Sequence, residues 1–216
     1  MKILVVSDHE SRKIWDYFEP GMLDEYELIL SCGDLKPEYL SFLATMSHAD
    51  VLYVRGNHDK SYDKFPPEGC IPVDDQVYVH KGLRILGLGG SMRYKDEPCM
   101  FTEEEMKKRI RKLRSKIRKN KGFDILLAHA AAKGIHDGED LPHSGFQCFL
   151  DLIDEYHPKF FLHGHMHKTY GTRFKQLDTR GETTIVNAYE RCKIEFPDEE
   201  LAARPVKKHF LKRREG

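Results

Sequence analysis

The sequence reads VLYVRGNHD from Val51 to Asp59, where an apolar run stops at a glycine and a group of polar side chains. The same arrangement recurs at four other places. There, the residues at or just after the end of an apolar run are Val6-Ser7-Asp8-His9-Glu10, Cys32-Gly33-Asp34, Leu127-Ala128-His129 and Gly164-His165-Met166-His167. Short, continuous apolar runs are typical of strands that are buried on both faces. The pattern therefore predicts a β-sheet structure that presents polar side chains at its strand ends.

The order of predicted elements favours an α/β fold. Apolar, β-branched runs predict strands at Ile3–Val6, Leu28–Leu30, Val51–Val54, Val77–Val79, Arg84–Leu88, Ile125–Leu127, Phe160–Leu162 and Thr183–Val186. Helices are predicted at Ser11–Phe18 and Pro37–Met46, between the early strands. Alternating strands and helices indicate parallel strands with right-handed crossovers. The second half alternates more loosely, which favours a mixed sheet or two facing sheets.

A long helix is predicted to begin after Thr102. Thr102 and Glu105 have the spacing of a capping box, and Met106, Ile110 and later apolar residues recur every three or four positions. The other faces of this helix are almost entirely Lys and Arg, through Lys121. Clustered cations are a common feature of nucleic-acid-binding surfaces. No aromatic residues interleave with these charges, so the solvated face of a packed helix is the favoured interpretation.

Composition restricts the class of protein. The chain has 216 residues, with 35 Lys+Arg balanced by 35 Asp+Glu, so no net charge draws it to DNA or membranes. Five widely spaced cysteines argue against a disulfide framework. No apolar stretch approaches the roughly 20 residues that span a bilayer. These features predict a cytoplasmic protein with one main domain.

The polar residues at the strand ends have the chemistry of a metal centre. Loops beyond the carboxyl ends of strands gather functional groups, because the sheet fixes the loops relative to one another. A carboxylate such as Asp34 can bridge two cations, and the other carboxylate, amide and imidazole groups can complete their coordination. A hydroxide that bridges two ions attacks phosphorus in line with the leaving oxygen. His58 is then placed to donate to the leaving group or to a phosphoryl oxygen.

These motifs, taken in order, resemble those of the calcineurin-like metallophosphoesterase family. That family's signature runs Asp-x-His, Gly-Asp, Gly-Asn-His-Asp/Glu, His and Gly-His-x-His, and the resemblance covers roughly residues 1–187. It implies a two-sheet αββα sandwich with mixed sheets, here assigned to residues 1–196, followed by a flexible basic tail at 197–216. It also implies two metal sites. Asp8, residue 10, Asp34 and His167 would hold one ion, and Asp34, Asn57, His129 and His165 the other.

Glu10 departs from the family pattern, which has a histidine at this position. If the strand stays extended, Asp8 and Glu10 point to one side and His9 to the other, unless a bulge turns His9 inward. Glu10 as a ligand would favour manganese or iron over zinc, which remains an alternative. If Glu10 instead points away, one metal binds weakly or not at all.

Three further residues are candidates for substrate binding. Arg93 ends a glycine-rich segment and could clamp a phosphate, although an exposed arginine on a flexible connection is the alternative. His136 and His143 lie in the polar segment 130–145, which is a candidate lid or an ordinary surface loop.

The sequence therefore predicts a metal-dependent phosphohydrolase that cleaves a phosphodiester or a phosphomonoester. The expected substrate is a small phosphoester, with a nucleotide among the candidates, and nucleic acid is the less favoured partner. A non-catalytic or weakly active interaction scaffold on the same fold, with an altered first metal site, is the alternative.

Overall fold

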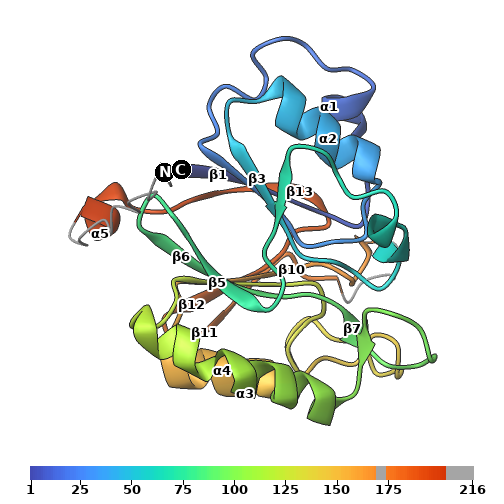
Figure 1. Ribbon diagram of the computed structural model, residues 1–216, viewed down its shortest axis with the longest axis vertical. Coiled ribbons are helices and arrows are strands. Elements are labelled where there is room, and N and C mark those ends of the chain that lie inside the picture. Colours follow the sequence, from blue (N-terminus) through green and yellow to red (C-terminus); the bar gives the residue numbers. More distant parts are fainter. Residues whose placement is uncertain (169–173, 203–216) are drawn as a thin grey trace, which may run out of the picture.

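Two facing β-sheets form the centre of the molecule, and helices cover the outer face of each sheet (Figure 1). The computed structural model describes residues 1–168 and 174–202. The first sheet has the strand order β13-β1-β2-β3-β4, in which β1 to β4 are parallel and β13 is antiparallel. Its strands are β1 (Lys2–Ser7), β2 (Leu28–Ser31), β3 (Asp50–Tyr53), β4 (Cys70–Pro72) and β13 (Glu190–Glu195).

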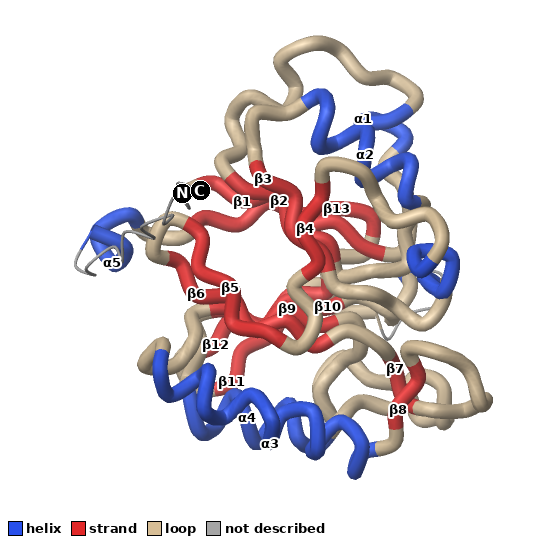
Figure 2. Tube along the Cα trace, viewed as in Figure 1, coloured by secondary structure: helices blue, strands red, loops and turns tan. Residues whose placement is uncertain are grey.

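The second sheet has the order β11-β12-β10-β9-β6-β5, with four parallel central strands and an antiparallel strand at each edge. Its strands are β5 (Gln76–His80), β6 (Leu83–Leu88), β9 (Ile125–Ala128), β10 (Phe160–His163), β11 (Leu177–Arg180) and β12 (Thr183–Asn187). A small parallel pair, β7 (Ser91–Met92) and β8 (Met100–Phe101), lies outside both sheets (Figure 2).

Three hydrophobic layers hold the sandwich together. The central layer lies between the sheets and includes Val5 and Leu30 from one and Leu127 and Leu162 from the other. Helices α1 (Arg12–Trp15) and α2 (Pro37–Met46) pack on the first sheet, and α3 (Glu103–Lys119) and α4 (Gln147–Tyr156) on the second. The predicted αββα sandwich with mixed sheets is confirmed.

All eight predicted strands are present, with ends that differ by at most one residue. The capping box of α3 is also present, with Glu105 N–H donating to Thr102 Oγ1 and the Glu105 carboxylate accepting from Thr102 N–H. Helix α1 is shorter than predicted. Strand β13 was missed because its sequence, ERCKIE, is largely charged, and the strand lies at the sheet edge with one face exposed.

Residues 198–202 form α5 (Asp198–Ala202), and the amino group of Met1 donates to the carboxylate of Asp198. The rest of the predicted tail, 203–216, lies outside the described residues. Within residues 1–168 and 174–202, no helix combines the length and apolar character needed to cross a bilayer.

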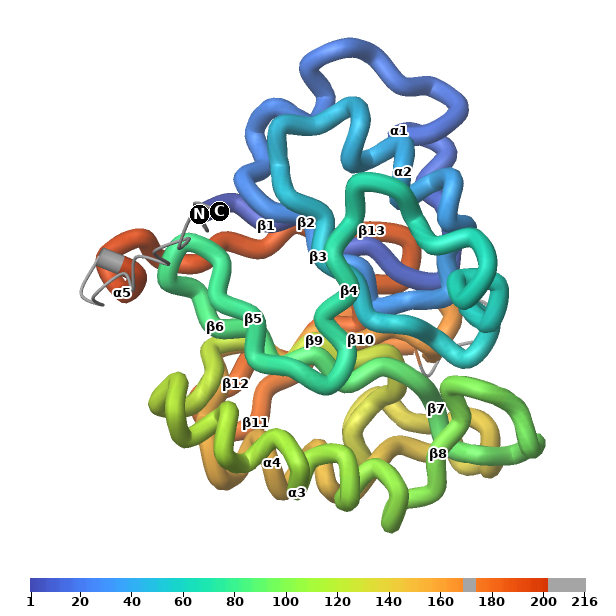
Figure 3. Tube along the Cα trace, in the orientation of Figure 1, coloured from blue at the N-terminus to red at the C-terminus, as the bar shows by residue number. Residues whose placement is uncertain are grey.

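The carboxyl ends of strands from both sheets meet at one end of the sandwich, as the trace in Figure 3 shows. Contacts that join the sheets there include a bond from His129, after β9, to the carbonyl of Cys32, after β2, and one from His165 N–H to the carboxylate of Asp8. Asp8, Asp34 and His165 leave their strands in left-handed conformation, with φ of 65°, 57° and 66°. Non-glycine residues adopt this conformation only when surrounding contacts compensate for its cost, which is common at functional sites.

Candidate metal centre

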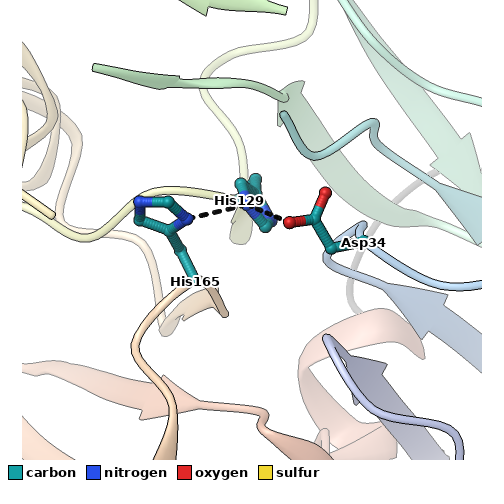
Figure 4. Close-up of side chains that lie close together, drawn as sticks. All are labelled: Asp34, His129 and His165. Atoms are coloured by element: carbon teal, nitrogen blue, oxygen red, sulfur yellow. Dashed lines mark hydrogen bonds and ion pairs between the residues drawn. The ribbon is translucent and has the colours of Figure 1, made fainter. Parts of the chain in front are cut away.

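Four buried or nearly buried side chains converge at this end of the sandwich. His129 Nε2 lies 3.0 Å from Asn57 Oδ1 and 3.1 Å from His165 Nδ1. Its distance to Asp34 Oδ2 is 3.3 Å. Figure 4 shows the two imidazole rings and the Asp34 carboxylate turned toward one another, and one potential ligand atom of each lies within 4.8 Å of the others.

In both His129 and His165, the hydrogen-bond partner of one ring nitrogen determines whether the other nitrogen is free to bind a metal ion. His129 Nδ1 is 2.8 Å from the carbonyl oxygen of Cys32, and His165 Nε2 is 2.8 Å from that of Pro142. A carbonyl only accepts hydrogen bonds, so each of these nitrogens carries a hydrogen. In the neutral rings, His129 Nε2 and His165 Nδ1 then carry lone pairs that face each other, and His129 Nε2 also faces the oxygens of Asp34 and Asn57. Four acceptors without a shared hydrogen need a cation between them, and this donor set fits a divalent metal ion.

The electrostatics of the cluster lead to the same conclusion. Burial acts to lower the pKa of His129, but the carboxylate of Asp34 outweighs it and raises that pKa to about 9. Burial acts to raise the pKa of Asp34, but the charge and hydrogen bond of His129 lower it to about 2. For His165, burial and the nearby His129 lower the pKa to about 4. In the metal-free protein a proton on His129 therefore takes the place of the cation.

Metal affinity should consequently rise with pH. Because the His129 pKa is raised to about 9, the ring is protonated below that pH, and a metal ion must displace the proton. We expect the affinity of the metal-free protein for Mn²⁺ to increase about tenfold per pH unit between roughly pH 6.5 and 8. Calorimetric titrations across this range measure it, and an affinity independent of pH would show that no proton competes with the metal.

The Gly56-Asn57-His58-Asp59 segment supports the cluster through its backbone. Asp59 Oδ2 accepts hydrogen bonds from Gly56 N–H at 2.7 Å and Asp34 N–H at 2.8 Å. His58 N–H donates to Asp34 Oδ1 at 2.8 Å. A Cβ at Gly56 would overlap the Asp34 carboxylate and crowd the His129 ring, so only glycine fits there. The motif thus positions Asp34 as well as supplying Asn57.

Asp8 and His167 form a second, smaller group beside the cluster. Both oxygens of Asp8 lie 2.9 Å from His165 N–H, and Asp8 Oδ1 is 3.5 Å from His167 Nε2. The ring of Tyr189 packs against His167, with centroids 5.2 Å apart. Gly164 is required here, because a Cβ would overlap the side chains of Ser7 and Asp8. Asp8 and His167 are thus adjacent.

Glu10 forms a hydrogen bond with the backbone at the start of α2. Its Oε1 accepts a hydrogen bond from Lys36 N–H at 3.1 Å, at the start of α2. The expectation that Asp8 and Glu10 share one side of an extended strand does not hold, because β1 ends at Ser7 and Asp8 is left-handed. The side-chain alternation of a strand therefore does not extend to residue 10.

The side chain of His58 is exposed at the cluster. Arg93 is turned elsewhere: its guanidinium donates to the carbonyl of Met100 and lies 3.0 Å from a carboxylate oxygen of Glu105 on α3. The structure therefore places Arg93 against β8 and α3, engaged in contacts of its own.

His136 and His143 line a cavity of about 420 Å³ that also reaches His167. The remaining lining residues are Asp137, Gly138, Glu139, Asp140, Met166, Phe174, Lys175 and Asn187. The side chain of His136 is almost fully buried, and its Nδ1 is 3.0 Å from Nε2 of His163. The segment 130–145 thus forms one wall of a pocket beside His167, and its Pro142 carbonyl anchors His165. Sequence reasoning missed Pro142 and the Cys32 carbonyl, because backbone acceptors leave no signal in residue type.

Comparisons with known proteins agree with this geometry. The sequence model for the calcineurin-like phosphoesterase superfamily domain matches residues 1–203. A search of curated proteins found no match. Among solved structures, TT1561 of Thermus thermophilus is similar with a TM-score of 0.58 and 16% identity, covering 88% of this chain and 89% of its own. The phosphopantetheinyl hydrolase PptH of Mycobacterium tuberculosis is similar with a TM-score of 0.57 and 12% identity, covering 94% and 93%. The chain belongs to the calcineurin-like phosphoesterase superfamily.

Proposed function

We propose that this protein is a metal-dependent hydrolase of a small phosphoester, either a phosphodiester or a phosphomonoester. The family carries out phosphoester hydrolysis with divalent metal ions. The observation that carries the proposal to this chain is the convergence of four acceptor atoms on one point, with the histidine tautomers fixed by Cys32 and Pro142. A divalent ion in place of the His129 proton would be coordinated by all four atoms, so a role in metal binding explains why they converge.

Two divalent ions are proposed at the centre. Asp34, Asn57, His129 and His165 would hold one of them, and Asp8, His167 and a shared Asp34 the other. Carboxylate, amide and imidazole donors without a thiolate suit manganese or iron, with zinc as the alternative. When bound, such ions lower the pKa of water and polarise phosphoryl oxygens.

The protein's own groups would orient the ester. The exposed His58 ring follows directly after Asn57, where it is proposed to donate a hydrogen bond or proton to the leaving oxygen. The cavity beside His167 is proposed to receive the leaving group, with His136 and His143 on its wall. The name of PptH as a hydrolase supports this class of reaction.

The basic helix gives little support to a nucleic-acid partner. Helix α3 buries Met106, Ile110, Leu113 and Ile117, and several of its cations are paired with nearby acids. Arg109 forms an ion pair with Asp75, and Arg114 forms a bidentate ion pair with Glu155. A packed helix with a solvated basic face accounts for the pattern.

We propose that the protein is located in the cytoplasm, because its cysteine pattern does not suit a disulfide framework.

A scaffold without activity is not favoured, because it has no need for four buried donors that converge. Hydrolysis of aryl phosphate mono- and diesters with added Mn²⁺ tests the proposal. Activity that disappears with a chelator and returns with Mn²⁺ is expected. Absence of activity on every ester, with protein shown to be loaded with metal, would instead favour the scaffold.

His58→Ala should lower the rate constant of hydrolysis while leaving the metal in place. General acid catalysis contributes about a hundredfold to ten-thousandfold, so a loss in that range is expected in kcat. The backbone N–H of His58 still supports Asp34, so metal content should be unchanged. His48→Ala, at an exposed histidine just beyond the end of α2, is the matched control. An unchanged kcat in His58→Ala would remove the proposed role.

A further inference from the structure

We propose that the metal centre is unequal: the Asp34–Asn57–His129–His165 cluster binds one divalent ion tightly, and the Asp8–His167 side binds a second ion weakly. We infer that the two sites differ because Glu10 caps helix α2 and does not bind metal. This inference rests on the proposed metal centre, and it concerns the affinities of the two sites and not the reaction.

The position of the Glu10 carboxylate is the first reason. Its Oε1 accepts from the N–H of Lys36, the residue that precedes the first residue of α2. Lys36 itself makes no side-chain capping bond, and Pro37 has no N–H to donate. A carboxylate at a helix N-terminus is stabilised both by the hydrogen bond and by the helix dipole. Glu10 therefore already has a structural partner.

The surroundings of Glu10 are the second reason. Tyr39 lies on α2, in the hydrophobic layer between that helix and the first sheet. Burial raises the pKa of its hydroxyl, and the negative charge of Glu10 adds to the rise. The Glu10 carboxylate thus lies close enough to α2 for its charge to affect Tyr39. The left-handed turn at Asp8 carries residues 9 and 10 out of the strand direction, which explains how Glu10 reaches α2.

The number of donors then differs between the two sites. Four protein donors surround the tight site, with one ligand atom each from Asp34, His129 and His165 within 4.8 Å of one another. The donors assigned to the second site are Asp8, His167 and a shared Asp34. Asp8 and His167 are also held less closely, at 3.5 Å. Fewer donors and a partly exposed histidine predict a lower affinity at this site.

Titration of the metal-free full-length protein with MnCl₂ tests the inference directly. Calorimetry, together with the electron paramagnetic resonance signal of unbound Mn²⁺, counts ions without any substrate. We expect one tight step and a second step at least roughly tenfold weaker. Asp8→Asn keeps one of the two oxygens that accept from His165 N–H, so it should weaken the second step more than the first. Two ions bound with equal affinity would overturn the inference.

Variants at Glu10 separate a cap from a ligand. Glu10→Gln keeps an oxygen that can accept from Lys36 N–H, whereas Glu10→Ala removes it. If Glu10 is a cap, both variants keep both Mn²⁺ steps within about twofold, and only Glu10→Ala lowers the melting temperature, by about 2–4 °C. If either variant loses the second step, Glu10 is a ligand and the inference is wrong.

These measurements remain distinct from the proposed function. A protein that binds one ion tightly and one weakly but hydrolyses no ester would sustain the inference and defeat the proposed activity. An active enzyme that binds two ions equally tightly would support the proposed activity and overturn the inference.

Discussion

His129→Ala is expected to remove the tight metal ion and to lower hydrolysis by about a thousandfold or more. His129 Nε2 lies within 3.3 Å of donor atoms of Asn57, His165 and Asp34, so its removal opens the middle of the cluster. Metal ions contribute several kcal/mol of transition-state stabilisation, and each 1.36 kcal/mol corresponds to about tenfold in rate. Metal content by mass spectrometry and kcat/KM with an aryl phosphate measure the two effects.

His48→Ala is the control for this variant, because His48 is an exposed histidine outside the cluster. It should retain full metal content and activity. Full metal content in His129→Ala would refute the assignment of His129 as a ligand.

Asp59→Ala is expected to destabilise the fold by about 2–4 kcal/mol, because each buried N–H left without a partner costs about 1–3 kcal/mol. Asp59 is buried, and its Oδ2 is the acceptor for both Gly56 N–H and Asp34 N–H. Those two residues begin the turns that carry Asn57 and the Asp34 carboxylate. The free energy of unfolding, from denaturant titration of the metal-free protein, measures the loss.

Asp59→Asn is the matched control. Both hydrogen bonds go to one oxygen, and asparagine keeps one oxygen in the same place. Burial and the nearby Asp34 charge raise the pKa of Asp59 to about 7, so a neutral side chain suits this position. Asp59→Asn should therefore keep the stability that Asp59→Ala loses. Equal losses in both variants would show that the carboxylate charge, and not the two hydrogen bonds, matters.

The fold could be predicted largely because its core strands are continuous apolar runs. Strands such as β2, LILS, and β9, ILLA, are buried along their whole length. Apolar runs this short favour a buried strand over a helix. Strands β4, β11 and β13 and the β7–β8 pair could not be predicted, because they are largely polar or only two or three residues long. Edge strands depend on backbone pairing more than on residue type.

The sequence predicted which residues lie at the site better than it predicted how their side chains are oriented. The order of Asp8, Asp34, Asn57, His129, His165 and His167 identified residues that the structure brings to one end of the sandwich. The orientation of Glu10 was beyond reach, because it follows from one left-handed residue, Asp8, and from a long-range bond to Lys36. Contacts between residues far apart in sequence leave no local pattern. The same holds for the Pro142 carbonyl that fixes the tautomer of His165.

Anomalous diffraction from crystals of the full-length protein grown with Mn²⁺ tests the central claim most directly. We predict a manganese peak enclosed by Asp34 Oδ2, Asn57 Oδ1, His129 Nε2 and His165 Nδ1. At limiting Mn²⁺ this peak should appear before any peak beside Asp8 and His167. A map that shows bound manganese elsewhere but none among those four atoms would contradict the account.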